Sequence, residues 1–404
     1  MSKLTGRADW HLRSNLVVIA YLIAALSTAI IQRGGQDNKL SWLTIHLLLF
    51  GATSNAIVTW SDHFASALLW ARPQDRRRQI NVLIFLNIGI IGVLVAVSAH
   101  IGWLIIASAT IVSIIIVFYL RAITVLIKQS LNKRFVPVIR YYQSAALFVL
   151  IGILLGVIDT FKVEKDPWQP RIALAHFHAN LLGWVGLTII GTLITLWPTV
   201  LGAQIHSRAV SFSTQGLRFL VIGTAGTILS ALIGQRTVLA ISILIYSIGV
   251  AITLGLSVLL MRSKKPDSAS SWMLLTGAIG LILLLVGDFI VVVSRHTPEK
   301  ILTEVEGHAL LIFTLWLFPT LLGSLIYLLP VVLGRGPAAT KEFAKDMNRG
   351  WRWRILLLPS ASFFLLMPSR FHPLGGMLTM LALGIFLSLT LRAIWGGRER
   401  SGTF

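Results

Sequence analysis

The sequence contains no cysteine, and only 12% of its 404 residues carry a charge. Without cysteine there can be no disulfide bond, no thiolate metal site and no haem attached through cysteine. A soluble domain carries about 25% charged residues, whereas this chain is 55% hydrophobic. The sequence also lacks a Walker motif, a Ser-His-Asp arrangement and a kinase signature. These absences argue against a soluble enzyme and against a disulfide-rich secreted domain.

Long apolar runs recur along the whole chain. A run of about 18 residues or more is long enough to cross a bilayer as a helix. We therefore predict an all-α polytopic membrane bundle of about 12 transmembrane helices, forming a single transmembrane domain over 1–404. The first run is too long for the core of a signal peptide, so we interpret it as the first span. The expected spans are 15–32, 41–62, 80–99, 102–126, 138–159, 174–200, 215–234, 237–261, 271–293, 308–333, 353–368 and 374–396.

The formal net charge of +20 is distributed unevenly between the two sides of this topology. In a soluble protein such an excess would suggest nucleic acid. Here the main basic runs all fall on the side that also holds both termini, and the positive-inside rule places that side in the cytoplasm. We expect a multi-pass plasma-membrane protein with cytoplasmic termini, in contact with the lipid bilayer and not with nucleic acid. The runs are "RPQDRRR" (72–78), "KQSLNKR" (128–134), "RSKK" (262–265) and "KEFAKDMNRGWRWR" (341–354).

The tenth span repeats the pattern of the sixth. A histidine is followed at equal intervals by glycine, proline and glycine, and the two segments end in "WPTVLG" and "LPVVLG". The second span begins with His46 and matches the same pattern more weakly. Spans 2, 6 and 10 are four helices apart, so we predict three four-helix pseudo-repeats at about 1–130, 131–262 and 263–404. The matched residues are His176, Gly191, Pro198 and Gly202 in the sixth span, and His308, Gly323, Pro330 and Gly334 in the tenth.

Four histidines are expected at similar depth near the outer ends of these three spans: His46, His176, His178 and His308. Ionisable side chains inside a membrane usually face the bundle interior and mark function. Imidazole is a common ligand of metal ions and of haem iron, so we predict that these four histidines bind a metal or haem. Residues two apart on a helix point about 200° away from each other. His176 and His178 are therefore expected to serve two different flanks of the sixth span.

Other polar residues near these histidines are candidate supporting groups. Asp159 and Asp288 lie near the outer ends of spans 5 and 9, where a carboxylate could orient a ligand histidine or be solvated at the interface. Asn180 follows His176 by one helical turn and could hydrogen-bond between helices. His100 lies in the outer turn after span 3 and could approach the cluster, or be exposed there.

Twelve spans with histidines on spans 2, 6 and 10 resemble the catalytic subunit of the haem-copper oxidases. In that family spans 2 and 10 ligate a low-spin haem, span 10 also ligates the catalytic haem, and span 6 supplies a copper ligand. The stretch "HFHANLLGWVGLTIIGTLITLWP" is more similar to the NnrS family, whose members contain haem and copper and are linked to nitric oxide stress. It also resembles the membrane region that is joined, in some actinobacteria, to a copper oxidase or nitrite reductase domain.

The sequence departs from the oxidase pattern at three places. Residues 215–234 contain no histidine, the tenth span has only His308, and the pattern His-Pro-Glu-x-Tyr is absent from the sixth span. A complete oxygen-reducing haem-copper centre is therefore not expected, and neither is a histidine–tyrosine cross-link.

The resemblance implies an integral membrane haem protein with one or two b-type haems in the outer half of the bundle. Copper, bound by some of the same histidines, is a further expected metal. His46 and His308 could form a bis-histidine haem site; alternatively, His176 or His178 pairs with one of them. The implied chemistry is electron transfer, or respiratory reactions of nitric oxide, nitrite or oxygen, with a separate copper oxidase, reductase or electron donor as partner. Two alternatives remain open: a histidine-dependent transporter of a metal or small molecule, and an assembly subunit without a cofactor.

Overall fold

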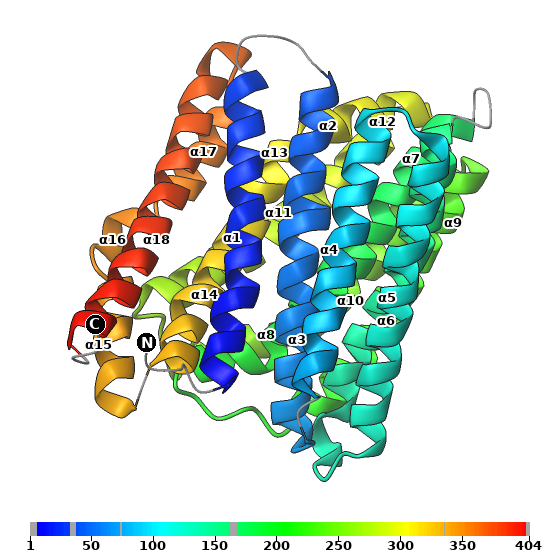
Figure 1. Ribbon diagram of the computed structural model, residues 1–404. Coiled ribbons are helices and arrows are strands. Elements are labelled where there is room, and N and C mark those ends of the chain that lie inside the picture. Colours follow the sequence, from blue (N-terminus) through cyan, green and yellow to red (C-terminus); the bar gives the residue numbers. More distant parts are fainter. Residues whose placement is uncertain (1–5, 33–37, 73–74, 162–167, 335, 401–404) are drawn as a thin grey trace.

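The computed structural model describes residues 6–32, 38–72, 75–161, 168–334 and 336–400. Within these ranges the protein is helical, with no β-strand, and its long helices run side by side along one direction (Figure 1). The all-α bundle expected from the sequence is confirmed. The described chain begins in α1 and ends in α18 at the same end of the bundle (Figure 1). The terminal residues 1–5 and 401–404, which we expect in the cytoplasm, lie outside the described residues.

The elements of the first half are α1 (Gly6–Gln32), α2 (Asn38–His46), η1 (Leu47–Thr53), α3 (Ser54–Leu69), α4 (Arg76–Ser98), α5 (Gly102–Lys128), η2 (Lys133–Phe135), α6 (Val136–Phe161), α7 (Trp168–His178), η3 (Ala179–Gly186) and α8 (Leu187–Val200). Those of the second half are α9 (Ala209–Ile233), α10 (Arg236–Leu260), α11 (Ala269–Ser294), α12 (Pro298–Gly307), α13 (Ala309–Leu311), η4 (Ile312–Leu317), α14 (Phe318–Leu333), α15 (Pro337–Met347), α16 (Trp351–Arg354), α17 (Leu357–Leu366), η5 (Ser369–Phe371) and α18 (His372–Arg400).

Among the described residues, eleven helical segments are long and apolar enough to cross a membrane. They correspond to eleven of the twelve expected spans. The expected span 353–368 is instead divided between α16 and α17, with a turn at Ile355 and Leu356. Pro359 lies in the first turn of α17 and has no N–H to donate to the preceding turn, so a helix can begin there but cannot run through without losing a hydrogen bond. Helix α17, with ten residues, packs along α18 (Figure 1).

Spans 2, 6 and 10 form the interior of the bundle. In these three spans, 61%, 83% and 72% of the most apolar stretch is buried, against 22–44% in the other eight. The remaining helices therefore surround these three and present much of their surface to lipid. The three inner spans are also the ones that carry the four candidate histidines, and the elements at their outer ends, α2, α7 and α12, lie at one end of the bundle (Figure 1).

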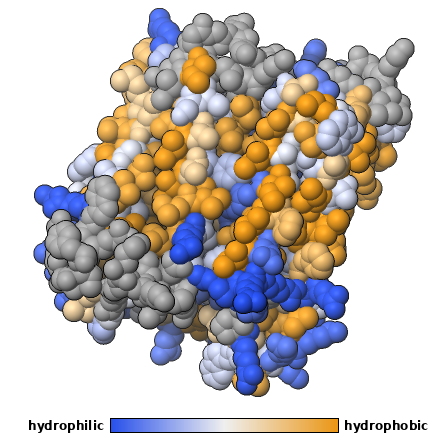
Figure 2. All heavy atoms as spheres, viewed as in Figure 1, coloured by the Kyte–Doolittle hydropathy of each residue, from blue (hydrophilic) through white to orange (hydrophobic). Residues whose placement is uncertain are grey.

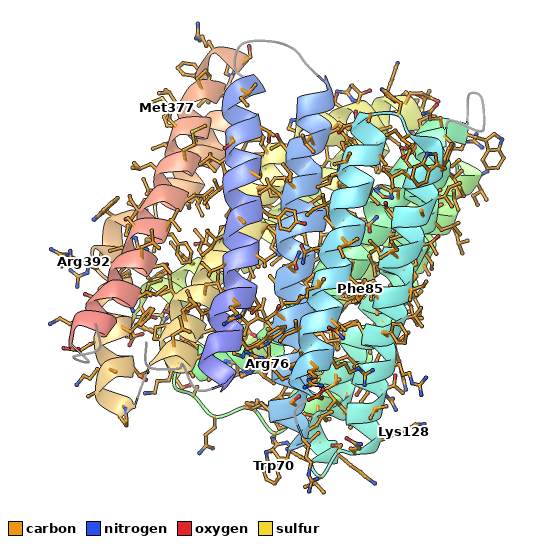
Figure 3. All side chains as sticks on the ribbon, in the orientation of Figure 1. Trp70, Arg76, Phe85, Lys128, Met377 and Arg392 are labelled. Atoms are coloured by element: carbon orange, nitrogen blue, oxygen red, sulfur yellow. The ribbon has the colours of Figure 1, made fainter. Side chains whose placement is uncertain are left out.

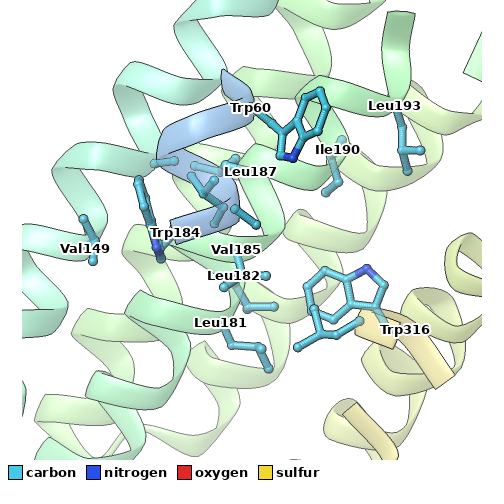
Figure 4. Packing of buried hydrophobic residues seen from close by; sticks show 14 of the residues in the cluster. Trp60, Val149, Leu181, Leu182, Trp184, Val185, Leu187, Ile190, Leu193 and Trp316 are labelled. Atoms are coloured by element: carbon cyan, nitrogen blue, oxygen red, sulfur yellow. The ribbon is translucent and has the colours of Figure 1, made fainter. Parts of the chain in front are cut away.

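Each inner span is interrupted by a π-helical segment at a similar place. These segments are η1, η3 and η4, and each follows the histidine-bearing outer turn of its span. A π-helical segment is rare and often accompanies a functional site, because its wider turn displaces the residues around it. When His176 is placed on His308, Trp184 in η3 coincides with Trp316 in η4, and both indoles are almost completely buried (Figure 4).

Each π-helical segment is packed against the span that precedes it in the chain. Helix α1 packs on η1, α6 on η3 and α11 on η4. Glycine allows the close approach in each case, since a Cβ would overlap Tyr21 at Gly51, Phe148 at Gly183 and the Leu315 carbonyl oxygen at Gly280. This recurrence is the contact pattern that three related units would produce.

The surface is apolar along the flanks and hydrophilic mainly at one end. Figure 2 shows a broad hydrophobic area over the sides of the bundle, with strongly hydrophilic residues gathered at the lower end. Arg76 and Lys128 lie at this lower end, whereas Phe85, which is 49% exposed, projects from the flank (Figure 3). A membrane-embedded protein requires this distribution, because lipid cannot solvate charged groups.

Candidate functional site

His46 and His176 are the two candidate ligands that the structure brings together. Their ring centroids are 6.5 Å apart and their planes differ by 20°. His46 is the last residue of α2 and His176 lies near the end of α7, so two inner spans contribute one ring each. This is one of the pairings that the sequence left open.

The His46 ring is fixed by its own helix. Its Nδ1 atom lies 2.8 Å from the carbonyl oxygen of Trp42, one turn earlier. Because a carbonyl oxygen can only accept, Nδ1 carries the proton and, in the neutral ring, Nε2 keeps a free lone pair. The Trp42 indole stacks on the imidazole, with centroids 4.1 Å apart and planes 26° apart. The ring is therefore held as a metal ligand would be, with its second nitrogen hydrogen-bonded to the backbone.

The His176 ring is fixed by the neighbouring helix. Its Nδ1 donates to the carbonyl oxygen of Gly152 in α6, at 2.8 Å, which again leaves Nε2 as the acceptor. The ring packs directly over Gly156, where a Cβ would lie 2.7 Å from the imidazole carbon Cε1. The Asn180 amide donates to the His176 carbonyl oxygen at 2.8 Å and lies over Gly152. The Gly152–Gly156 pair thus forms a notch that accepts His176 and Asn180.

His178 points to another flank, as the two-residue spacing predicts. It is fully buried, and its Nε2 lies 3.1 Å from the Asp288 carboxylate oxygen Oδ2 in α11. Its Nδ1 donates to the Leu174 carbonyl oxygen at 2.9 Å. Both ring nitrogens are therefore engaged in hydrogen bonds, and in this arrangement neither is free to bind a metal ion. Asp288 lies where a carboxylate could orient a histidine, and the histidine that it contacts is His178. The role of His178 as a metal ligand stays a prediction.

Two further histidines lie at the surface. The His308 side chain is 52% exposed, and its Nδ1 donates to the Glu304 carbonyl oxygen at 2.7 Å. Within the described residues no hydrogen bond or ring contact joins His308 to His46, so the proposed pairing of these two stays a prediction. His100 is exposed in the turn between α4 and α5, with a left-handed backbone (φ 57°).

The described residues contain no group of three or more His, Cys, Asp or Glu side chains placed to share a metal ion. The site is therefore a two-histidine site, with Asn180 beside it. Asp159 lies one turn beyond Gly156 on α6, the helix against which His176 packs. This position is compatible with the supporting role predicted for it.

A cavity lies between the three inner spans, beginning at Leu48, two residues after His46. It has a volume of about 100 Å³ and is lined mainly by the three inner spans, from Leu48 near the outer end to Phe64 near the other end of α3. Thr188 and Thr192 line it from α8, but each hydroxyl donates to a carbonyl oxygen four residues earlier in the helix. The cavity is therefore largely apolar, because these donors are already satisfied.

Sequence reasoning missed three parts of this site: the Trp42 stack, the glycine notch and the π-helical segments. The spacing of Trp42 and His46, four residues apart on a helix, could have indicated a ring contact. The motif "GILLG" (152–156) is of the small-xxx-small type that allows close helix packing. Nothing in the local sequence indicates a π-helical turn.

No protein-family model matches the chain, and no curated protein sequence matches it significantly.

Proposed function

We propose that this protein is an integral membrane metalloprotein in which His46 and His176 hold one metal centre in the outer half of the bundle. The observation that carries the proposal is the 6.5 Å separation of their ring centroids. A metal–imidazole bond is about 2.0–2.1 Å long, which places each ring centroid about 3.2 Å from the metal. Two imidazoles on opposite sides of one ion therefore have centroids about 6.4 Å apart, close to the spacing found.

The state of the two rings supports the same proposal. Both Nδ1 atoms donate to backbone carbonyl oxygens, which leaves Nε2 as the donor atom to a metal in each ring. Backbone or carboxylate partners at the second nitrogen are typical of metal-bound histidines. Two imidazoles on opposite sides leave little room for a substrate on an iron centre, so electron transfer is the function we favour over substrate activation.

The donor set fits haem b iron, which the resemblance to NnrS-like and oxidase-like proteins implies. A single copper ion is the alternative, because imidazole is also a common copper ligand.

Spectroscopy of the purified protein tests the proposal. Expression with ample haem and copper should yield protein with a Soret band if haem is bound, or about one copper per chain without a Soret band. Replacing His46 or His176 singly by Ala should remove the centre, whereas His308→Ala, at an exposed position, should retain it. A colourless protein without stoichiometric metal would contradict the proposal, and metal flux into vesicles would favour the transporter.

A further inference from the structure

A second pair of histidines lies at the opposite end of the inner spans. His11, near the start of α1, and His63, near the end of α3, have ring centroids 4.8 Å apart and planes at 90°. The His11 side chain is only 2% exposed. No local pattern in the sequence associates the two, because 51 residues and two spans separate them. Both belong to the lower end of the bundle in Figure 1, where α1 begins and α3 ends.

Trp60 holds both rings in place. Its indole stacks on His11, with centroids 4.9 Å apart and planes at 27°, and its ring lies nearly perpendicular to His63 at 5.7 Å. The indole N–H donates to the Asn15 side-chain oxygen at 3.3 Å, and the Asn15 amide donates to the His11 carbonyl oxygen at 2.6 Å. Helices α1 and α3 are thus joined around the two imidazoles, so the distance between the rings is fixed by packing.

The centroid separation of His11 and His63, which we call the inner pair, is shorter than that of His46 and His176, the outer pair. The shorter distance suits a different coordination geometry. With each centroid about 3.2 Å from a metal, two imidazoles in adjacent coordination positions, at bond angles of 90–110°, have centroids about 4.5–5.2 Å apart. The observed 4.8 Å lies within this range. Imidazole suits zinc and copper. The two rings are therefore spaced to occupy neighbouring positions of a tetrahedral or square-planar ion.

A carboxylate lies next to the pair in the sequence. Asp62 precedes His63, and the Gln79 side-chain amide donates to its Oδ2 atom at 2.7 Å. The Arg76 guanidinium at the same end lies over the Trp10 ring, with its carbon 4.8 Å from the ring centroid. The Asp62 carboxylate is thus held by Gln79, and the Arg76 guanidinium also packs on an aromatic face at this end of the bundle. Two protein nitrogens leave the remaining positions of the ion to water.

We propose that His11 and His63 form a second metal site, which binds one zinc or copper ion at the lower end of the bundle. This site is independent of the outer pair, since it uses other side chains at the other end of the inner spans. Because the two ligands lie in α1 and α3, a bound ion would link the first two spans.

Metal titration of the full-length protein tests the site. The His46→Asn variant serves as the background, because it removes the outer pair and leaves the inner one intact. We expect this variant to bind one equivalent of Zn²⁺ or Cu²⁺ by calorimetry. Adding His11→Asn or His63→Asn should weaken binding at least tenfold, whereas adding His206→Asn, in a loop, should leave it unchanged. Equal affinity in all four proteins, or no binding in the background, overturns the proposal.

If a double variant does not fold, X-ray absorption can instead count the imidazole ligands of the ion in the His46→Asn protein. The zinc-loaded His46→Asn protein should show two imidazole ligands, and electron paramagnetic resonance of the Cu²⁺ form should show coupling to two nitrogens. Fewer than two imidazoles overturns the proposal. Loss of the outer centre in His46→Asn is read separately from its absorbance, so failure of the outer site and failure of the inner site are distinguishable.

Discussion

At the scale of single residues, the position of the His176 ring depends on two glycines in the facing helix α6, which have no side chain to occupy its space. His176 lies over Gly156, and Asn180 lies over Gly152, so both polar side chains occupy space that any larger residue would fill. The hydrogen bond from His176 to the Gly152 carbonyl oxygen is possible only at this close approach. The two glycines therefore affect the site indirectly, by leaving room for the His176 ring.

A methyl group at Gly156 should disturb this arrangement. In Gly156→Ala the new Cβ would lie 2.7 Å from His176, so the ring must move, at a cost of about 1–3 kcal/mol. We expect a lower Tm and at least a tenfold loss of metal or haem bound by the outer pair. Gly384→Ala is the matched control, because nothing lies within 4 Å of its Cβ and alanine favours a helix by about 0.5–1 kcal/mol. Unchanged metal content in Gly156→Ala would contradict this role of the notch.

The sequence could identify candidate ligands, but not their pairing. His46 and His176 were both predicted from their place near the ends of inner spans, and the opposed directions of His176 and His178 followed from helical geometry. Which rings meet depends on how far each helix rotates about its axis. A π-helical segment changes that rotation, and hydropathy does not record it. The inner pair, His11 and His63, depends on the contact of α1 with α3, which no local pattern reveals.

At the scale of elements, two of the three glutamates of the short helix α12 have opposite effects on stability. Its N-cap, Thr297, accepts a hydrogen bond from the Lys300 N–H. A hydrogen bond with the Thr297 side chain is the main cause that lowers the pKa of Glu299. Glu306, in the last turn, has its pKa raised by burial. Ionised Glu299 therefore stabilises the folded state, whereas ionised Glu306 destabilises it.

The two carboxylates predict opposite pH dependence. Because the folded-state pKa of Glu306 is raised, its penalty exists at neutral pH and disappears as the pH falls through that pKa. Glu306→Gln should raise Tm at pH 7, with the gain shrinking on acidification. For Glu299 the stabilisation is present above its ordinary pKa of 4.5 and lost as the pH falls through the lowered folded value. Glu299→Gln should lower Tm at pH 7, with the loss shrinking below about pH 4.5. Parallel Tm curves for both variants would contradict this assignment.

Elements were predictable where hydropathy alone decides them. Eleven expected spans are continuous and apolar, and the structure has them as long helices. The expected span 353–368 is divided because Pro359 restarts the helix, a local effect that an averaged hydropathy does not detect. The π-helical segments were not predictable for a related reason, since one extra residue per turn leaves the composition of a span unchanged.

At the scale of the whole molecule, the arrangement is an inner group of three spans within a shell of the others. The inner spans are recognisable from the sequence by their histidines and from the structure by their burial. The sequence repeat indicated which spans are equivalent, but it did not show that the equivalent spans are the central ones. That follows from packing, because ionisable side chains inside a membrane usually face the bundle interior, and these three spans are the most buried.

The orientation of the molecule can be measured directly, because the chain has no cysteine of its own. Ser263, after α10, and Thr303, in α12, are both exposed and lie at opposite ends of the bundle by the predicted topology. In intact cells a membrane-impermeant maleimide should label Thr303→Cys at once and Ser263→Cys only after permeabilisation, because the positive-inside rule places the basic "RSKK" loop in the cytoplasm. The unmodified protein should take up no label. Reversed labelling would invert the topology.

The recurring π-helical segments also bear on how the chain arose. A π-helical turn is, in effect, one residue inserted into an α-helix. Three separate insertions at the same place in three spans would each have to be retained independently, whereas a single insertion copied by duplication needs to occur only once. The shared position of η1, η3 and η4 therefore favours an ancestral four-helix segment that already contained the insertion before it was tripled.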